Sequence, residues 1–491
     1  MAMTSFTIPK EVALVAETLS SAGFDAYLVG GCVRDLVRGR EPKDWDITTN
    51  ATPQQIQSLF ADSFYENEYG TVGVKTESED ARLRVVEVTP YRIEGTYSDA
   101  RRPDTVTFAK TLEEDLERRD FTINAIAYDP HKGVLVDPHR GQDDIQRKTI
   151  VTVGPPHNRF SEDALRMLRA IRLSAELQFS IETKTAEGIA HNAPLLAKIS
   201  QERIRDEFIR ILMSDTPMQA LFIAQKLGLL SYIIPELEEG IGSQQNQAHS
   251  YDVFEHSLRT LQHAADKKWP MEVRISALLH DVGKPASRKW SEEKGDYTFH
   301  GHEVIGSRMA KKIMQRLRFS KEVTERVVAL IRWHMFFSDP DKITLSAVRR
   351  IIRNVGQENM WNLLNLRICD RIGTGRPKEQ PFRLRKYISM VEEALRDPVS
   401  VGQLHIDGGD IMRISGEKPG PRLGFVLHAL LEEVIDDPKR NEKSYLEKRA
   451  LSLLELPPED LRRLGEKGKV RRDEEDEAEI RKLRKKYHVD K

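Results

Sequence analysis

The stretch LVGGCVRDLVRGREPKDWDITTN, residues 28–50, decides how the N-terminal part of the chain folds. A short apolar run ends in Gly30 and Gly31, and a second β-branched run follows two carboxylates, Asp44 and Asp46. On a strand, residues i and i+2 project to the same face, so the two carboxylates would lie together while Trp45 packs on the opposite side. Two neighbouring carboxylates repel each other, and each raises the proton affinity of the other unless a cation lies between them. The stretch therefore predicts either a cation site on a strand or an ordinary solvated loop.

A second strand-like run, RVVEVTPYR at residues 84–92, favours the cation site. Val85, Glu87 and Thr89 share one face of this strand, which makes Glu87 either an edge-strand charge or a third carboxylate. Mg²⁺ prefers a few carboxylates together with phosphate oxygens. A glycine pair lets the backbone approach a triphosphate closely. Three carboxylates of this kind suit a two-metal site for phosphoryl displacement.

Composition limits the remaining possibilities. The chain has 491 residues, which predicts about three or four domains. The formal net charge of -1 argues neither for nor against a nucleic-acid partner. The two cysteines, Cys32 and Cys369, are too few for a disulfide framework and fit a reducing compartment. The N-terminus lacks signal-peptide features, and no run approaches the roughly 20 apolar residues of a membrane span, so we expect a cytoplasmic protein.

Two further stretches could hold a nucleotide. In ERRDFTINAIAYD, residues 117–129, Arg118 and Arg119 could clamp phosphates and Asn124 could orient a ribose; the alternative is a charged turn. In SEDALRMLRAIRL, residues 161–173, Asp163 and Arg166 stand at i and i+3 on one helical face. A surface ion pair is the default interpretation. Alternatively, an acceptor beside a donor would match the Watson–Crick edges of cytosine or adenine and refuse guanine and uracil.

Together, LVGGCVRD…DWD, EVTPYR, RRDFTINAIA and EDALRMLRAIR closely resemble the class II tRNA nucleotidyltransferases and the related bacterial poly(A) polymerases over residues 20–235. The resemblance implies Mg²⁺ bound by Asp44 and Asp46, with Glu87 as the third catalytic carboxylate. It also implies a set of nucleotide-binding residues: Gly30, Gly31, Arg34, Arg118, Arg119, Asp120, Asn124, Glu162, Asp163, Arg166 and Arg169.

Two segments bear on specificity. TYSDARRPDTVTF, residues 96–108, resembles the flexible loop with which such enzymes switch from CTP to ATP, which argues against an enzyme that adds only CC. SFYENEYGTVGV, residues 63–74, lacks the basic stretch of the poly(A) polymerases and favours tRNA as substrate. These segments leave full CCA addition and A addition alone unresolved.

A second constellation consists of histidines and aspartates. His280 and Asp281 end an apolar helical run, a pairing that suits a divalent metal. The pattern H…HD…D at His256, His280, Asp281 and Asp370 resembles the HD-domain phosphohydrolases over residues 245–375, and His302 and His334 are candidates for a second metal. The resemblance implies a metal-bound water that attacks a phosphate ester, such as a 2′,3′-cyclic phosphate or a phosphomonoester at an RNA end. The alternative is an HD module that serves only as structural body.

The expected fold is an α+β nucleotidyltransferase head, a small mixed sheet with helices, followed by mostly α-helical parts. The expected domains are the head at 1–140, a helical neck for nucleotide selection and RNA binding at 141–240, the HD domain at 241–376 and a helical tRNA-contacting tail at 377–491, with a helix beginning near Gly420. The leading hypothesis is a tRNA nucleotidyltransferase that builds or repairs the 3′ CCA end from CTP and ATP and is fused to an HD phosphohydrolase. The alternatives are an A-adding enzyme, a poly(A) polymerase, or an HD hydrolase with a non-catalytic RNA-binding head. Oligomeric state and the identity of the HD metal (Ni²⁺, Mn²⁺ or Mg²⁺, among others) stay open.

Overall fold

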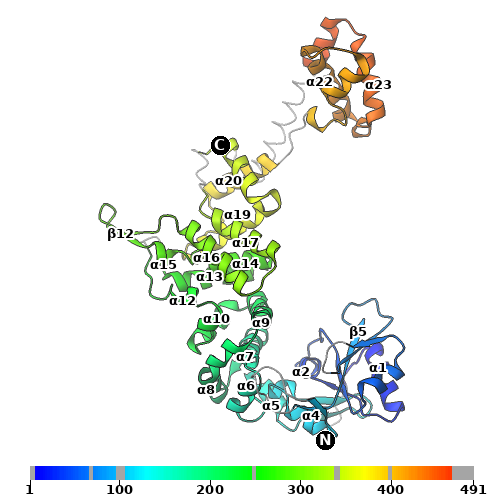
Figure 1. Cartoon of the computed structure of the whole chain (residues 1–491), viewed down its shortest axis with the longest axis vertical. Helices are drawn as coiled ribbons and strands as arrows, with labels where there is room; N and C mark the ends of the chain where they lie inside the picture. The colour runs from blue at the N-terminus through cyan, green and yellow to red at the C-terminus, as the bar shows by residue number, and fades with distance from the viewer. Residues whose placement is uncertain are drawn as a thin grey trace. The chain divides into compact units, whose positions relative to one another are not determined.

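The structure is a computed structural model that describes residues 6–65, 70–94, 106–245, 250–336, 343–395 and 401–466. The chain forms two compact units, one of Met1–His334 with Asn365–Pro377 and one of Met335–Leu364 with Lys378–Lys491. A mixed sheet with helices comes first and mostly helical regions follow, which confirms the predicted fold class (Figure 1). Among the described residues, no helix combines the length and apolar character that a membrane span requires.

The N-terminal head contains a seven-stranded sheet in the order β3-β4-β5-β2-β1-β8-β9. Its strands are β1 (Tyr27–Val29), β2 (Asp46–Thr49), β3 (Ser63–Tyr65), β4 (Val72–Lys75), β5 (Val85–Pro90), β8 (Ala127–Asp129) and β9 (Val134–Val136). Strands β2 and β5 run parallel, and the other neighbours are antiparallel. The two runs singled out in the sequence therefore lie side by side in the middle of the sheet.

Alternation along the strands divides their side chains between two apolar clusters. Leu28 and Ile47 pack with α1 (Lys10–Ser21) and α3 (Pro53–Leu59) in the main core, and Trp45 joins them as predicted. Val29 points the other way, into a smaller cluster with Tyr91, Leu112 and Leu116. The second face of the sheet is the one on which Asp46 and Thr48 lie, since they alternate with Trp45 and Ile47.

Several short elements complete the head. They are α2 (Gly31–Val37), α4 (Leu112–Glu117), the 3₁₀ helix η1 (Thr122–Asn124) and α5 (Gly141–Arg147), with β6 (Arg92–Glu94) and β7 (Val106–Phe108) paired as a separate ribbon. Helices α3 and α4 each begin with a capping box, built by Thr52 with Gln55 and by Thr111 with Glu114. Apart from residues 106–108, the stretch 96–108 that resembles the specificity loop lies outside the described residues.

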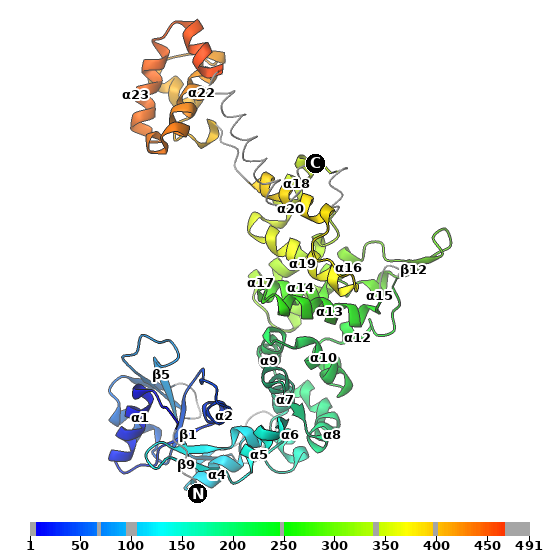
Figure 2. The ribbon, with the colours of Figure 1, turned by 180° about the vertical axis from the view of Figure 1, so that it is seen from behind.

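Helices dominate after the head. The neck contains α6 (Pro156–Glu162), α7 (Leu165–Leu177), α8 (Thr183–Asn192), η2 (Ala193–Lys198), α9 (Gln201–Met213), α10 (Pro217–Lys226), α11 (Leu230–Ile233) and α12 (Pro235–Glu238), with β10 (Thr149–Ile150) and β11 (Ser180–Ile181) as a two-stranded sheet. The HD region contains α13 (Val253–Asp266), α14 (Met271–Leu279), α15 (Lys284–Ser287), α16 (His302–Arg316), α17 (Lys321–Trp333) and α19 (Met360–Gly373). A hairpin of β12 (Lys289–Ser291) and β13 (Asp296–Thr298) projects from this region in both views (Figures 1 and 2).

The second unit is helical throughout its described residues. Its further elements are α18 (Leu345–Val355), η3 (Gln357–Asn359), α20 (Phe382–Leu395), η4 (Val401–Gln403), α21 (Gly408–Ser415), α22 (Pro421–Asp436), η5 (Pro438–Arg440) and α23 (Lys443–Leu454). The helix predicted near Gly420 is confirmed as α22, with Pro421 in its first turn. Its apolar stripe packs against α21 and α23 in a core of their own.

Candidate functional site

The three predicted carboxylates of the head lie around the junction of β2 and β5. Asp46 and Glu87 are paired residues on these parallel strands. The sequence pattern predicted that Asp44 lies on the same strand as Asp46, and this prediction was wrong. Strand β2 begins only at Asp46, and Asp44 lies in an exposed bend before it. The carboxylates are nevertheless neighbours, since the charges of both Glu87 and Asp44 act on Asp46.

The glycine pair lies directly against these carboxylates. Gly30 has a φ of 82°, a conformation that side chains disfavour, and an added Cβ there would lie 3.5 Å from Asp46 Oδ2 and 3.4 Å from Arg119 Nη1. An added Cβ on Gly31 would lie 3.9 Å from Asp44 Oδ1 and 3.6 Å from Arg34 Nη2. The turn therefore brings backbone, two carboxylates and two guanidinium groups into one small space.

The electrostatics of Asp46 favour a bound cation. Burial, followed by the charges of Glu87 and Asp44, raises the pKa of Asp46 to about 7, and Arg119 only partly opposes this. A carboxylate in this state gains from a divalent cation that neutralises its neighbours. The residues present thus fit Mg²⁺.

Four of the predicted nucleotide-binding residues, Arg34, Asn124, Asp120 and Arg169, form a continuous chain of contacts. Arg34 Nη1 donates to Asn124 Oδ1 at 2.8 Å, and Asn124 Nδ2 donates to Asp120 Oδ1 at 3.2 Å. Asp120 Oδ2 in turn accepts from Arg169 Nε of α7 at 2.7 Å. Burial alone would raise the pKa of Asp120, but the charges of Arg169 and Arg166 outweigh it and hold that pKa well below its usual value.

The predicted base-reading pair is arranged differently from the sequence expectation. Asp163 and Arg166 do not share a helical face, because α7 begins only at Leu165 and Asp163 Oδ1 accepts from Leu165 N at 3.0 Å. Arg166 Nη1 pairs instead with Glu162 Oε2 at 2.6 Å. Asp163 Oδ2 pairs with Arg203 Nη2 of α9 at 2.7 Å. Asp163 and Arg166, the two residues predicted to recognise the base, therefore each have a charged partner of their own.

Arg118 and Arg119 share a partner that the motif analysis missed. Both guanidinium groups contact the carboxylate of Asp115, one turn earlier in α4, at 2.6 Å and 3.0 Å. Asp115 was not predicted because acidic residues are common in the first turn of helices. Arg203 was not predicted because arginines are common on helices. The spacing of three and four residues from Asp115 to Arg118 and Arg119 is a local signal for their pairing, whereas the sequence carried no signal for Arg203.

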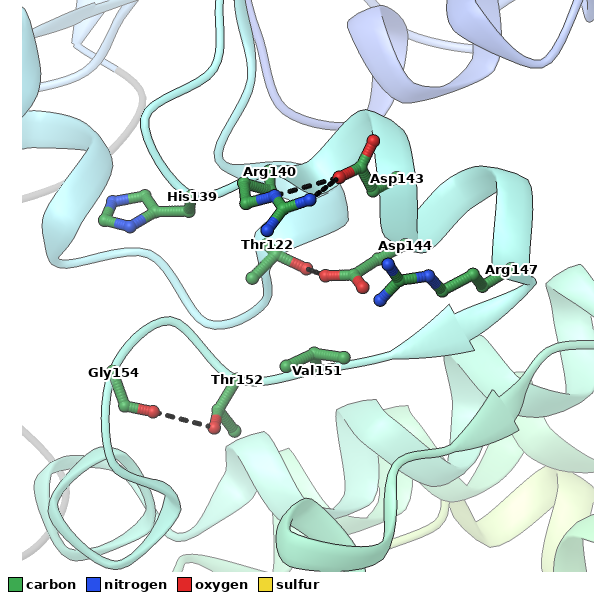
Figure 3. A pocket seen from close by; sticks show the side chains of 9 residues that line it. All are labelled: Thr122, His139, Arg140, Asp143, Asp144, Arg147, Val151, Thr152 and Gly154. Atoms are coloured by element: carbon green, nitrogen blue, oxygen red, sulfur yellow. Dashed lines mark hydrogen bonds and ion pairs between the residues drawn. The ribbon is translucent and has the colours of Figure 1, made fainter.

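The head also contains a cavity of about 270 Å³, lined in part by Thr122, His139 and Arg140. Figure 3 shows the residues that line it. Thr122 Oγ1 donates to Asp144 Oδ2 at 2.7 Å, and Arg140 Nε donates to Asp143 Oδ2 at 2.9 Å. None of the predicted nucleotide-binding residues lines it. The cavity is therefore separate from the candidate nucleotide site.

The HD residues come together in two buried groups, each with ligand atoms within 4.8 Å of one another. The groups are His256 with His280 and Asp370, and Asp281 with His302 and His334. In the part of the chain that the structure describes, these are the compact groups of this kind, and the head carboxylates do not make a third. All six residues predicted for the HD site are thus brought together.

Asp281 joins the two groups. Its Oδ2 lies 3.1 Å from Nε2 of both His256 and His280, and its Oδ1 lies 3.5 Å from His302 Nε2 and 3.8 Å from His334 Nε2. The buried Lys284, not predicted from the sequence, places Nζ 2.7 Å from Asp281 Oδ2 and donates to Gln245 Oε1 at 2.6 Å.

The imidazole rings are oriented as metal ligands are. Nδ1 of His280, His302 and His334 each lies 2.7–2.9 Å from a backbone carbonyl oxygen, which directs Nε2 toward the centre. Burial alone would lower the pKa of His280, but Asp281 and Asp370 outweigh it and raise that pKa to about 10. Burial and the charge of His280 lower the pKa of His334 to about 3. A donor set with this surplus of negative charge fits divalent metal ions.

Comparison with known proteins agrees with this geometry. Family models match for the poly A polymerase head domain at residues 26–151, the probable RNA and SrmB-binding site of polymerase A at 178–241 and the HD domain at 253–372. A CCA-adding enzyme of Leuconostoc mesenteroides is 32% identical over 438 residues, 88% of this chain and 93% of that protein. A CC-adding tRNA nucleotidyltransferase of Thermus thermophilus is 32% identical over 426 residues, 83% of this chain and 89% of that protein.

The solved structure of the Bacillus stearothermophilus CCA-adding enzyme in complex with CTP is 26% identical, with a TM-score of 0.60 over 91% of this chain and 98% of that chain. The head, the RNA-binding segment, the HD domain and identity along nearly the whole length lead to one conclusion. The chain belongs to the class II CCA-adding enzyme family of tRNA nucleotidyltransferases.

Proposed function

We propose that this protein adds the 3′-terminal CCA to tRNA, or repairs it, with CTP and ATP as substrates. The observation that carries the proposal is the pairing of Asp46 with Glu87 beside Asp44, next to a glycine turn lined by Arg34 and Arg119. This arrangement offers carboxylates for a cation and guanidinium groups for phosphates in one place.

In the reaction, the 3′ hydroxyl of tRNA attacks the α-phosphate of the bound nucleotide, and pyrophosphate leaves. Asp44 and Asp46, with Glu87, would hold Mg²⁺, whose role is to activate the attacking hydroxyl and to stabilise the leaving oxygen. Arg118 and Arg119 hold the triphosphate by charge-assisted hydrogen bonds. Asn124, fixed between Arg34 and Asp120, orients the ribose.

Base selection is assigned to Asp163 and Arg166. An aspartate accepts from the exocyclic amino group of cytosine or adenine, while an arginine donates to the ring nitrogen. Uracil and guanine present a carbonyl and an N–H at these positions, so a buried acceptor would be left unpaired. Glu162 and Arg203 support this pair through the contacts described above.

The test uses tRNAs that end before CCA, after one C and after CC, each incubated with a single nucleotide. The proposal expects CTP to extend the first two and ATP to extend the third. Addition of A alone would identify an A-adding enzyme, and long adenosine runs on any RNA would identify a poly(A) polymerase. A CCA-adding relative and a CC-adding relative are both 32% identical to this chain, so the test must also distinguish these two activities. Arrest after CC would establish a CC-adding enzyme.

We propose a metal-dependent phosphohydrolase as a second activity, located in the HD domain. The observation that favours it is the pair of buried ligand groups joined by Asp281. Such a site, when loaded with metal, provides a nucleophile for attack on a phosphate ester. The substrates that suit it are 2′,3′-cyclic phosphates or phosphomonoesters at an RNA end.

The second activity is tested by phosphate-ester hydrolysis on RNA that ends in a 2′,3′-cyclic phosphate. Asp281→Asn is expected to abolish hydrolysis while nucleotide addition continues. Hydrolysis without detectable nucleotide addition would instead support a hydrolase whose head only binds RNA. No hydrolysis by the metal-loaded wild type would leave the HD domain as a structural body.

A further inference from the structure

One buried carboxylate connects several parts of the head and has no role in the family resemblance. Asp115 lies on α4, is fully buried and belongs to none of the motifs considered above. Its Oδ1 accepts from Arg118 Nε at 3.0 Å and Nη2 at 2.6 Å. Its Oδ2 accepts from Arg119 Nη2 at 3.0 Å. A single carboxylate therefore holds both arginines of the RRD motif.

Asp115 also reaches the strand that carries the catalytic carboxylate. The hydroxyl of Thr48 lies 3.3 Å from Asp115 Oδ2, and Thr48 stands two residues after Asp46 on the same face of β2. The backbone N–H of Arg92, the first residue of β6, lies 3.4 Å from Asp115 Oδ1. Arg119 in turn places Nη1 beside Gly30 and Asp46.

We infer that Asp115 is a positioning residue that holds Arg118 and Arg119 in the orientation in which they bind the triphosphate. The inference rests on the proposed nucleotide site. Burial would raise the pKa of Asp115, but Arg119 and Arg118 outweigh it and hold that pKa below its usual value, so the carboxylate is ionised at neutral pH. An ionised, buried carboxylate fixes guanidinium groups far better than a neutral partner does.

The neutral variant has a specific consequence. In Asp115→Asn one oxygen becomes an NH₂ group, which donates hydrogen bonds and cannot pair with a guanidinium. Arg118 and Arg119 then lose the charged partner that accepts from both of them. The two guanidinium groups at the triphosphate site thereby lose their fixed orientation, whereas Asp163 and Arg166 keep their charged partners Arg203 and Glu162.

The loss of binding affinity in Asp115→Asn should be the same for every ligand whose phosphates occupy this site. CTP and ATP differ in their bases but carry the same triphosphate, and inorganic pyrophosphate carries no base at all. A positioning role at the phosphates therefore predicts equal weakening of all three ligands. A general loosening of the fold would instead lower the melting temperature and alter base selection.

The experiment measures the dissociation constants of CTP, ATP and pyrophosphate for the full chain by calorimetry, in chelator and without tRNA. Asp115→Asn is expected to raise each dissociation constant by about tenfold, which corresponds to the loss of roughly one charge-assisted hydrogen bond. Glu113→Gln is the matched control, since Glu113 is an exposed acid on the same helix, and it should change none of them. Unchanged binding in Asp115→Asn, or a loss for one base only, would overturn the inference.

Two further variants keep the test decisive. Thr48→Val removes the hydroxyl near Asp115 Oδ2 and should weaken the three ligands by about threefold; if Asp115→Asn does not fold, unchanged binding in Thr48→Val overturns the inference. Arg118→Ala and Arg119→Ala test the proposed nucleotide site itself. If they leave CTP binding unchanged, the nucleotide site is wrong, whereas weakened binding in them with normal binding in Asp115→Asn refutes the positioning role alone.

Discussion

Asp46 and Glu87 face each other as paired residues on the parallel strands β2 and β5. Burial, followed by the charges of Glu87 and Asp44, raises the pKa of Asp46 to about 7. The pairing of the two carboxylates is unfavourable without a cation, and a bound divalent cation would neutralise their repulsion. We take it as the centre of the proposed nucleotidyl transfer.

Asp46→Asn should therefore separate activity from stability. We expect nucleotide addition to fall by roughly 10³-fold or more, since a metal ligand contributes several kcal/mol to the transition state. The metal-free variant should melt at the same temperature as the wild type or higher, because a buried, repelled charge has been removed. Rates with saturating Mg²⁺ and melting in chelator check both parts. Retained addition would refute the assignment of the metal site.

Arg203→Ala should reduce base selection without removing activity. Arg203 holds Asp163 through a short charge-assisted contact, so its loss frees the carboxylate that accepts the amino group of the base. We expect discrimination of CTP and ATP against UTP and GTP to fall by about tenfold, the value of one such contact. The measurement is kcat/KM for each nucleotide on tRNA ending after CC or before CCA.

A matched control for Arg203 is available on the same helix. Arg210 lies in the last turn of α9, where its exposed side chain contacts Glu176 and not the candidate site. Arg210→Ala should leave discrimination unchanged. Equal loss in both variants would mean that α9 acts through stability alone.

Asp120→Asn should change how stability depends on pH. The folded-state pKa of Asp120 is depressed, so its ion pair with Arg169 contributes stability above the unfolded pKa and loses it as pH falls through the folded value. We expect the free energy of unfolding of the variant to be lower than that of the wild type by about 1–2 kcal/mol near neutral pH. This value is discounted because Arg169 is partly exposed. The melting difference from wild type should stay constant from about pH 8 to pH 5 and shrink below about pH 4. A constant difference down to pH 2 would show that folding does not depress the pKa of Asp120, which would contradict the stabilising ion pair.

The HD domain should bind two metal ions that can be removed separately. His334→Ala takes a ligand from one group and Asp370→Asn takes one from the other, while Asp281→Asn affects both. Metal content after dialysis is expected to be two ions per chain in the wild type, one in each of the first two variants and none in the third. A wild type that retains a single ion, lost equally in all three variants, would contradict two sites.

Much of the site followed from local patterns. Period-2 alternation placed Glu87 correctly on β5 and Trp45 in the core. The H…HD…D spacing found four of the six residues that the fold gathers, and the separate histidine candidates supplied the other two. Contacts across the fold were not predictable. Arg203 of α9 pairs with Asp163 40 positions away, and Lys284 is linked to Gln245 39 positions away.

The geometrical error in the expected base-reading pair has a local cause. The spacing of Asp163 and Arg166 suggested one helical face, but Asp163 accepts from Leu165 N and so lies before the first turn of α7. Capping geometry of this kind depends on the backbone conformation of a single residue, which periodicity does not reveal.

The most direct test of the central claim is the sequence of the 3′ ends made from tRNA that lacks CCA, with all four nucleotides present. The account predicts that wild-type ends terminate in CCA with no further addition, and that Asp46→Asn leaves the ends unextended. Ends that carry uridine or guanosine, ends that stop after CC, or extension by Asp46→Asn would contradict it.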